Sequence, residues 1–390
     1  MLVDPQRRLF LRSIAGVTTV MAIGPLSPSA GRAASPVFPL GDPWAAWSPE
    51  ALRHHHDPRL RGIAHAILAP NPQNLQPWVC ELHGDNYIIL RNGGERRLAA
   101  SDMPDRQLTV GFGTFSELLI MAAEAEGYAV EMGLFPEGEP WPVLDHRPIA
   151  IFTLHRQTPR RDPLLDHILE RHTNRTPFDL ARSVSIQQLT AIRKATRKPE
   201  RVHLNLEPGL ATKIQDITMR AWDVWMISSP STRLEVARVT HIGNTAIAAA
   251  PYGPYVSDTA LKKAAGPITF ETLSDPNSVQ FKVNRTAYRR AIQTGLAHLW
   301  IVAPQFDRKG MFDAGRDWVR AHLQAIALGL DMEPHSQALQ DFPEIVPYVD
   351  EMHNALGVSA PARIHMLGRI GYGSAVGPAP RLPVEAHLQS

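Results

Sequence analysis

Apolar residues recur at steps of three and four in two well-separated stretches, which predicts two amphipathic helices. The later stretch carries its apolar stripe, with one glycine, at Phe312, Gly315, Val319, Leu323, Ile326 and Leu330. The earlier stretch covers 113–127, and in both stretches two glycines stand 14 residues apart, at 113 and 127 and at 315 and 329. A stripe with this spacing lies on one face of a helix and packs against a partner. Both helices are therefore expected to be central.

Short apolar or alternating stretches follow each predicted helix and predict strands. They are 128–132 and 149–154 after the first helix, and 330–332 and 364–370 after the second. A further alternating strand is expected at 79–83. The repeated order of helix, short strand and later strand indicates a tandem α+β duplication. Coincidence is the alternative, because glycine near the ends of a helix is common.

The first residues combine paired arginines with a short apolar run. The pair at 7–8 is followed by an apolar run over 14–26, then by small residues and proline. This order is typical of a twin-arginine export signal, expected to span 1–34 with cleavage near Ala33 or Ala34. The 13-residue run falls short of the roughly 20 residues that span a bilayer, so a stable membrane anchor is the weaker interpretation. A periplasmic or otherwise exported protein that uses the twin-arginine machinery is expected.

Charge and cysteine content narrow the class of protein. Of the 40 Lys+Arg and 38 Asp+Glu residues, four arginines and one aspartate lie in the first 33 residues, so the remainder has a net charge of −1. That charge does not favour nucleic-acid binding. Cys80 is the one cysteine, so no internal disulfide can form, and a large core or a cofactor must supply stability. The length suits two domains or one duplicated domain.

The segment 171–175 (Arg-His-Thr-Asn-Arg) places two arginines on either side of a hydroxyl. It closes an apolar helical pattern over 164–169, and a proline soon follows, so it is expected on one helical turn where a helix ends or a new one begins. Guanidinium forks bind phosphate through charge-assisted hydrogen bonds worth about 1.5–3 kcal/mol each. Arg171, Thr173 and Arg175 are therefore candidates for a dianion clamp. An exposed face of salt bridges is the alternative.

The loop 70–78 (Pro-Asn-Pro-Gln-Asn-Leu-Gln-Pro-Trp) is dominated by amides and prolines. Amide side chains on a loop of fixed φ present donors and acceptors in one plane, which suits the edge of a heterocycle better than a charge or a metal. Trp78 is expected to be a core anchor beside the site rather than a stacking partner. An ordinary turn stiffened by three prolines is the alternative.

Together these two segments resemble the nitroreductase superfamily of FMN enzymes, in particular the Acg family of FMN-binding oxidoreductases. A third point of resemblance is the glycine-containing strand 368–373, followed by Pro-Arg-Leu-Pro at 380–383. The resemblance covers most of the chain after the export signal and implies an FMN cofactor. Through it Arg381 is assigned to the FMN phosphate, whereas a lysine often found two residues earlier in the family is Ala379 here. The cofactor-binding residues that the resemblance implies are Arg171, His172, Thr173, Arg175, Arg381, Pro70, Asn71, Asn74 and Gln76.

The resemblance also implies how the chain is organised. Nitroreductases are homodimers with FMN at the subunit interface, the phosphate clamp coming from one subunit and the amide loop from the other. Here the halves are expected at 44–156 and 164–390, so that one chain resembles a nitroreductase dimer and holds one FMN between its halves. The reciprocal site is expected to be degraded, because 53–57 (Arg-His-His-His-Asp) lacks the hydroxyl and the second arginine. A lid over the flavin is expected at 251–282.

No side chain stands out as a general acid, base or nucleophile, so no catalytic residue is predicted. The adjacent histidines at 54–56 diverge in direction and lack a partner at a ligand spacing, so no metal is expected. Neither Gly-x-Ser-x-Gly nor a Gly-x-Gly-x-x-Gly after a strand occurs, which disfavours hydrolases and Rossmann enzymes.

The expected function is that of an exported FMN-dependent oxidoreductase of the nitroreductase type. It would reduce a small-molecule acceptor in a two-electron ping-pong cycle, with NAD(P)H, the usual donor of the family, or another electron donor. A flavin-binding or flavin-sequestering protein with little turnover is the first alternative. A structural or interaction protein that keeps the fold without a cofactor is the second.

Overall fold

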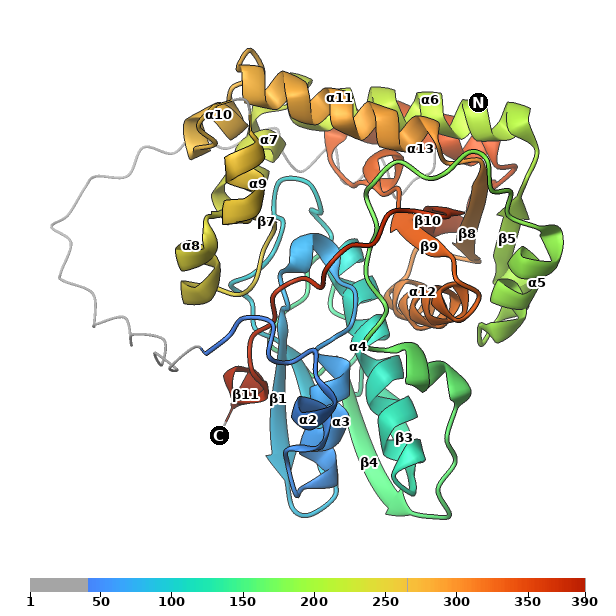
Figure 1. The fold of residues 1–390 in the computed structure, drawn as a ribbon. Coiled ribbons are helices and arrows are strands. Elements are labelled where there is room, and N and C mark those ends of the chain that lie inside the picture. Colours follow the sequence, from blue (N-terminus) through green and yellow to red (C-terminus); the bar gives the residue numbers. More distant parts are fainter. Residues whose placement is uncertain (1–40, 265, 390) are drawn as a thin grey trace, which may run out of the picture. The chain divides into compact units, whose positions relative to one another are not determined.

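Two long helices pack against each other at the centre of the fold (Figure 1). They are α4 (Arg106–Ala125) and α12 (Arg308–Ala327) in the computed structural model, which describes residues 41–264 and 266–389. Both helices are 20 residues long, and α12 begins 202 positions after α4. The predicted pair of central helices is confirmed, although each begins one or two turns earlier than the apolar stripe indicated.

The two central helices cross at a reciprocal pair of glycines. A Cβ atom built on Gly113 would lie 2.0 Å from the carbonyl oxygen of Phe312, and one built on Gly315 would lie 2.0 Å from the carbonyl oxygen of Val110. Each contact therefore joins a glycine to the residue three positions before the opposite glycine. No side chain fits at either position, and the helix backbones touch directly.

The first sheet is built mainly from residues before 157. Its strands are β1 (Trp78–His83), β2 (Tyr87–Asn92), β3 (Tyr128–Leu134), β4 (Ala150–Arg156) and β11 (Leu388–Gln389). Their spatial order is β11-β1-β2-β4-β3, and the pairs β1–β2, β2–β4 and β3–β4 are antiparallel. One face packs on α4 and on α3 (Pro58–Ala66) through a core that includes Trp78, Ile88 and Phe152.

The second sheet repeats the strand order of the first. Its strands are β5 (Val202–Asn205), β8 (Ala297–Ala303), β9 (Asp331–Pro334) and β10 (Arg363–Gly371). Their spatial order is β5-β8-β10-β9, and all neighbouring strands are antiparallel. Numbered along the chain, the strands lie in the order first, second, fourth, third, as β1, β2, β4 and β3 do in the first sheet. In Figure 1 the chain then runs from β10 across to the first sheet, where β11 pairs with β1 in parallel.

Helices cover both faces of the second sheet. One face packs on α12 and on α5 (Ile186–Ala195), and the other on α6 (Pro208–Asp223), α11 (Val279–Gln293) and α13 (Val346–Ala355). The shorter helices are α2 (Pro49–Arg53), α7 (Pro230–Val239), α8 (Asn244–Ala249), α9 (Asp258–Lys263) and α10 (Phe270–Ser274). The remaining short turns and strands are η1 (Pro72–Asn74), η2 (Pro163–His167), η3 (Pro199–Arg201), η4 (Val224–Ser228), η5 (Gln337–Leu339), η6 (Pro343–Ile345), η7 (Val384–His387), β6 (His241–Ile242) and β7 (Tyr255–Val256).

Each central helix begins with a buried arginine that reaches the opposite half. The guanidinium of Arg106 donates to Asp341 at 2.6 Å and to the carbonyl oxygen of His365 at 2.9 Å. The guanidinium of Arg308 donates to the carbonyl oxygen of Pro140 at 2.9 Å. Asp341 and Pro140 both lie between the third and fourth strands of their sheets. The two halves are thus fastened by the same type of contact in both directions.

Several predicted features are confirmed and others are modified. The strands expected at 79–83, 128–132, 149–154 and 364–370 are present as β1, β3, β4 and β10, and 330–332 overlaps β9. The segment 157–163 is a connection, but β11 carries the C-terminus back to the first sheet. The segment of the expected lid contains β7, α9, α10 and the first turn of α11. The predicted export signal lies outside the described residues.

The helix α4 is long and apolar enough to cross a membrane by length and composition. However, 89% of its most apolar window is buried inside the protein. Its apolarity is explained by its position between the first sheet and α12, where nearly every side chain contacts protein.

Candidate anion and flavin site

The segment 171–175 is extended, and the expected helical turn was wrong. The short helix η2 ends before it, and Thr173 forms a parallel β-bridge with Met332 of β9. The backbone amide of Asn174 donates to the carbonyl oxygen of Met332 at 3.1 Å. The side-chain amide of Asn174 donates to the carbonyl oxygen of Ser374 at 2.8 Å. Pairing with β9 and with the C-terminal segment has replaced the intrahelical hydrogen bonds that the apolar pattern implied.

Arg171 is buried, with 2% of its surface exposed, and has few partners. One terminal nitrogen, Nη2, donates to the carbonyl oxygen of Leu68 at 3.0 Å. Its Nε and Nη1 atoms have no hydrogen-bond partner among the described residues. A buried guanidinium with unpaired nitrogens is costly, since a buried polar group normally finds a partner.

Arg381 reaches the same place from the C-terminal segment. Its Nε donates to the carbonyl oxygen of Ile67 at 2.7 Å, and Nη2 donates to those of Leu68 and Ala69 at 3.3 and 3.2 Å. Its Nη1 donates to the side-chain oxygen of Asn74. The three carbonyl groups follow the C-terminus of α3, where the helix dipole is negative. Partial charges of this kind orient a guanidinium but do not neutralise it.

Trp47 covers both guanidiniums and was not predicted as a site residue. Its ring lies 5.8 Å from the Cζ atom of Arg171 and 5.1 Å from that of Arg381, within the range of cation–π contacts. The indole Nε1 donates to the carbonyl oxygen of Ala379 at 2.8 Å, which fixes the ring. A tryptophan two residues before a short helix carries no sequence signal for this role, because its partners Arg171 and Arg381 are far along the chain.

The two buried arginines carry positive charge that the described residues do not neutralise. Among residues 41–264 and 266–389, no carboxylate lies within 4.0 Å of either guanidinium. Burial lowers the pKa of Arg171 to about 10, and burial together with the charge of Arg171 lowers the pKa of Arg381 to about 9. Both groups remain protonated at neutral pH. The site therefore favours an anion of one or two charges.

His172 and His322 line the same site as neutral rings. The Nδ1 atom of His172 lies 3.1 Å from the carbonyl oxygen of Val376, and its Nε2 atom is buried without a partner among the described residues. Burial, reinforced by the charge of Arg171, lowers the pKa of His172 to about 4. The Nε2 atom of His322, on α12, lies 3.2 Å from the backbone oxygen of His172. If Nδ1 of His172 donates to Val376, then Nε2 is an acceptor available to a hydroxyl group.

The amide loop packs beside the arginines, but its side chains hold protein backbone. Asn71 accepts from the backbone amide of Gln76 at 2.9 Å, and Gln76 donates to the carbonyl oxygen of Pro251 at 2.9 Å. Asn74 donates to the carbonyl oxygen of Pro380 at 3.1 Å. Asn71 thus fixes the loop internally, whereas Gln76 and Asn74 fasten it to the start of the expected lid and to the C-terminal segment.

The loop backbone is strained where these amides occur. Three of its residues, Gln73, Asn74 and Gln76, have φ values of 48°, 54° and 50°. The left-handed region is unfavourable for residues other than glycine, so surrounding contacts must impose it. One such contact is the hydroxyl of Thr114 on α4, which donates to the carbonyl oxygen of Pro70 at 2.6 Å.

The outer part of the predicted clamp is open to solvent. The side chain of Arg175 is 68% exposed, and its Nε lies 3.9 Å from the carboxylate of Glu333, a long ion pair. Thr173 is half-buried between Arg171 and Arg175. The structure thus brings together Arg171, His172 and Arg381 with the amide loop, and leaves Arg175 at the rim.

Burial separates Trp78 from the exposed histidines near the start of the described chain. Trp78 is fully buried against Phe115, as expected of a core anchor. His54 and His56 are exposed. His353 and His365 are buried.

Neither of two well-defined cavities in the described residues is lined by the predicted clamp. The larger, about 510 Å³, lies between α4, α12 and the segments 160–163 and 196–197. The smaller is lined by residues of 193–203. The arginine site is the better candidate for the predicted cofactor, because it holds buried donors without partners, whereas most charged groups of the larger cavity are already paired.

No family model matches this chain, and no curated protein matches it. Its neighbours among solved structures are nitroreductase-like FMN flavoproteins. A nitroreductase-like family protein from Bacillus cereus is 13% identical, with 59% of this chain and 97% of that chain covered at a TM-score of 0.33. A nitroreductase with bound FMN from Bacteroides fragilis is 13% identical, with 57% and 95% covered at 0.32. An FMN-dependent nitroreductase from Mycobacterium smegmatis, in complex with NADPH, is 14% identical, with 54% and 88% covered at 0.33. Likeness at this level assigns neither a family nor a cofactor.

Proposed function

We propose that the chain is an FMN-dependent oxidoreductase of the nitroreductase type, in which Arg171 and Arg381 bind the FMN phosphate. The observation that carries the proposal is the pair of buried guanidiniums that converge on Leu68 without a carboxylate nearby. A phosphate would pair with the free Nε and Nη1 atoms of Arg171 and neutralise both charges. The neutral ring of His172 would accept a hydrogen bond from a hydroxyl of the ribityl chain.

The proposed flavin lies between two halves of one chain that arose by tandem duplication. Three observations support the duplication: the shared strand order, the reciprocal contacts of Gly113 and Gly315, and the reciprocal reach of Arg106 and Arg308. The carbonyl groups at 67–69 and the amide loop come from the first half, and both arginines come from the second. One FMN per chain follows, because the exposed His54 and His56 provide no second clamp.

FMN supplies the two-electron chemistry of the proposed reaction. The chain binds the phosphate, orients the cofactor and holds the amide loop in its strained conformation. No side chain is assigned to proton transfer, which fits direct transfer from cofactor to a small acceptor in a ping-pong cycle. The donor is NAD(P)H or another reductant. Export by the twin-arginine route, which carries folded proteins, suits a chain that binds its cofactor before translocation.

The first experiment is the visible spectrum of the mature protein, expressed with its export signal and purified without added flavin. A two-banded flavin spectrum with about one FMN per chain after denaturation is expected. Arg171→Ala and Arg381→Ala should each weaken FMN binding by roughly 10-fold to 150-fold, since each removes a charge-assisted contact of about 1.5–3 kcal/mol. A colourless wild-type protein that also fails to take up added FMN would overturn the proposal in favour of a cofactor-free role.

Arg175→Ala is the matched control for the two buried arginines. It removes the same charge from the same predicted motif, but its side chain is 68% exposed and screened by water. Its effect on FMN binding should therefore be less than 5-fold, about 1 kcal/mol. An effect as large as that of Arg171→Ala would mean that the extended segment closes further on the phosphate than the structure shows.

A second candidate function is flavin sequestration with little turnover. Trp47 covers the arginines, and the start of the lid is fastened to the amide loop by the contact between Gln76 and Pro251. Both features oppose the entry of a bulky donor. Rapid reduction of bound flavin by NAD(P)H, followed by oxidation by a nitroaromatic or quinone, would support the enzyme, whereas stable oxidised flavin under the same conditions would favour sequestration.

A further inference from the structure

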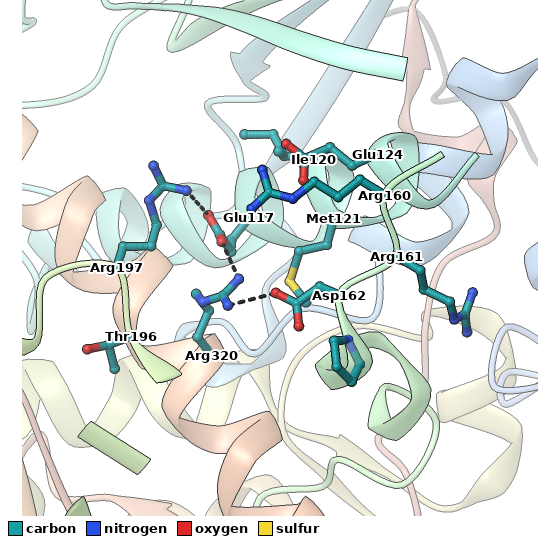
Figure 2. Close-up of a pocket in the computed structure, with 11 residues that line it drawn as sticks. Glu117, Ile120, Met121, Glu124, Arg160, Arg161, Asp162, Thr196, Arg197 and Arg320 are labelled. Carbon is teal, nitrogen blue, oxygen red and sulfur yellow. Dashed lines mark hydrogen bonds and ion pairs between the residues drawn. The ribbon is translucent and has the colours of Figure 1, made fainter. Parts of the chain in front are cut away.

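The larger cavity lies between the two central helices, and none of the proposed flavin-binding residues lines it. Figure 2 shows its lining side chains, which come from α4, α12 and two connecting segments. They are Glu117, Ile120, Met121, Glu124, Arg160, Arg161, Asp162, Pro163, Thr196, Arg197 and Arg320. Its volume of about 510 Å³ is ample for a small molecule.

This cavity occupies the position that corresponds to the flavin site in the other half. The helix α12 repeats α4 at an offset of 202 residues. Ile120 of the cavity therefore corresponds to His322, which contacts the backbone of His172. The segment 196–197 precedes β5 as the amide loop precedes β1. The cavity is thus a second inter-half site, with different side chains.

Two carboxylates of the cavity are already occupied by arginines. Glu117 is 1% exposed and accepts from Arg316 at 2.7 Å and from Arg320 at 3.1 Å. Asp162 accepts from Arg320 at 2.7 Å and also caps η2 through the backbone amide of Leu164 at 3.0 Å. Figure 2 shows Arg320 between these two carboxylates. These acids therefore position Arg316 and Arg320, and the paired guanidiniums compensate their negative charges.

Arg160 and Arg197 are available to a ligand, whereas Arg161 pairs with Asp166. Within the described part of the chain, the guanidinium of Arg160 has no partner. Arg197 lies 3.7 Å from Glu117, and its side chain is 47% exposed. The lining holds four arginines against three carboxylates, so one positive charge is uncompensated. Two partners outside the cavity, Arg316 of Glu117 and Asp166 of Arg161, add one positive and one negative charge. The surplus is therefore unchanged.

We propose that this cavity binds a small phosphate-bearing anion through Arg160 and Arg197, with Arg320 held in place behind them by Glu117 and Asp162. Guanidinium forks match phosphate oxygens, and the partly enclosed wall strengthens the contact relative to open solvent. Glu124 is the one lining carboxylate with no side-chain partner among the described residues, and it opposes the anion. The ligand is either free phosphate or the phosphate group of a small ester.

The test is calorimetric titration of the FMN-loaded protein with inorganic phosphate in a phosphate-free buffer. One saturable site is expected. Arg160→Ala and Arg197→Ala should each weaken binding at least tenfold, and Glu124→Gln should strengthen it by removing a repulsive charge. Arg182→Ala, whose guanidinium stacks on Tyr372 outside the cavity, is the matched control and should bind as the wild type does.

The outcomes separate this site from the proposed flavin site. Absence of saturable phosphate binding, or unchanged binding in both Arg160→Ala and Arg197→Ala, would overturn the inference. If the protein takes up no FMN, the same titration is run in Arg171→Ala, which removes the competing clamp. A parallel titration with glycerol 3-phosphate identifies the source: tighter binding than inorganic phosphate indicates an ester, and weaker binding indicates free phosphate.

Discussion

Arg171 and Arg381 donate hydrogen bonds to the same carbonyl oxygen, that of Leu68, at 3.0 and 3.3 Å. They arrive from separate segments, one bridged to β9 and the other leading to β11. Two like charges gathered on one acceptor lower the stability of the protein unless an anion joins them. This arrangement couples folding of the second half, packing of the C-terminal segment and anion binding.

The first prediction concerns the cost of that buried charge. Arg171→Met should raise the free energy of unfolding of the flavin-free protein by roughly 1–3 kcal/mol, because it removes an unpaired buried charge and keeps apolar volume. The folded and unfolded states are both protonated at pH 7, since the pKa of Arg171 falls only to about 10, so the cost is fully present there. Urea unfolding measures it.

The same Arg171→Met protein should retain little FMN, so stability and cofactor binding should change in opposite directions. Arg289→Met is the control, an exposed change expected within about 0.5 kcal/mol. A flavin-free Arg171→Met protein more than 1 kcal/mol less stable than the wild type would show that the bond to Leu68 outweighs the buried charge.

The second prediction concerns Trp47, which contacts both guanidiniums. Trp47→Leu should lower stability by about 1–2 kcal/mol more than Trp44→Leu does, which corresponds to two cation–π contacts. Trp44 is a close control, because its Nε1 donates to the carbonyl oxygen of Pro378 at 3.1 Å, much as that of Trp47 donates to Ala379 at 2.8 Å. Equal losses in the two variants, measured by thermal or urea unfolding, would rule out an energetic role for the stacking.

The central helices and most strands could be predicted because local patterns encode them. The spacing of Gly113 and Gly127 recurs at Gly315 and Gly329, and the structure explains it. The first glycine of each pair permits contact between helix backbones, and the second ends its helix with a φ of 86° or 68°. A close backbone contact and a positive φ can both be recognised in the sequence, since few residues other than glycine satisfy them.

The conformation of 171–175 could not be predicted from local pattern. The apolar residues before it suggested a helix, yet its hydrogen bonds go to Met332 and Ser374, which are remote in sequence. The same holds for Trp47, whose partners lie in the second half. Residue types indicated the chemistry of the site, but only the tertiary fold shows that Arg171 is buried and Arg175 is exposed.

The third prediction tests the reciprocal glycine contact. Gly113→Ala and Gly315→Ala each place a Cβ atom 2.0 Å from a backbone carbonyl oxygen, so the helices must separate. Each should cost more than about 3 kcal/mol or prevent accumulation of soluble protein. Gly62→Ala is the matched control within α3, because its Cβ would lie 3.6 Å from the nearest atom, in Leu119. It should be neutral or stabilising by up to about 1 kcal/mol through helix propensity. Similar losses in all three variants would disprove the close crossing.

The fourth prediction concerns the pH dependence of stability through His353. In the neutral ring, Nδ1 lies 2.8 Å from the carbonyl oxygen of Val349, and Nε2 accepts from the backbone amide of Ile364 at 3.0 Å. Burial lowers the pKa of His353 to about 4, whereas that of an unfolded histidine is about 6.5. Between these values the unfolded state binds one more proton, so His353 should remove about 1.4 kcal/mol of stability for each unit by which the pH falls.

Comparison with His353→Gln isolates this contribution from other groups. Burial raises the pKa of Asp102 to about 7 and that of Asp317 to about 6, so these carboxyl groups favour the folded state as the pH falls and partly mask the histidine. They are present in both proteins and cancel in the difference. The stability advantage of the wild type should therefore shrink from pH 6.5 towards pH 4 in urea unfolding. A difference that stays constant over this range would mean that His353 is charged in the folded protein or titrates normally.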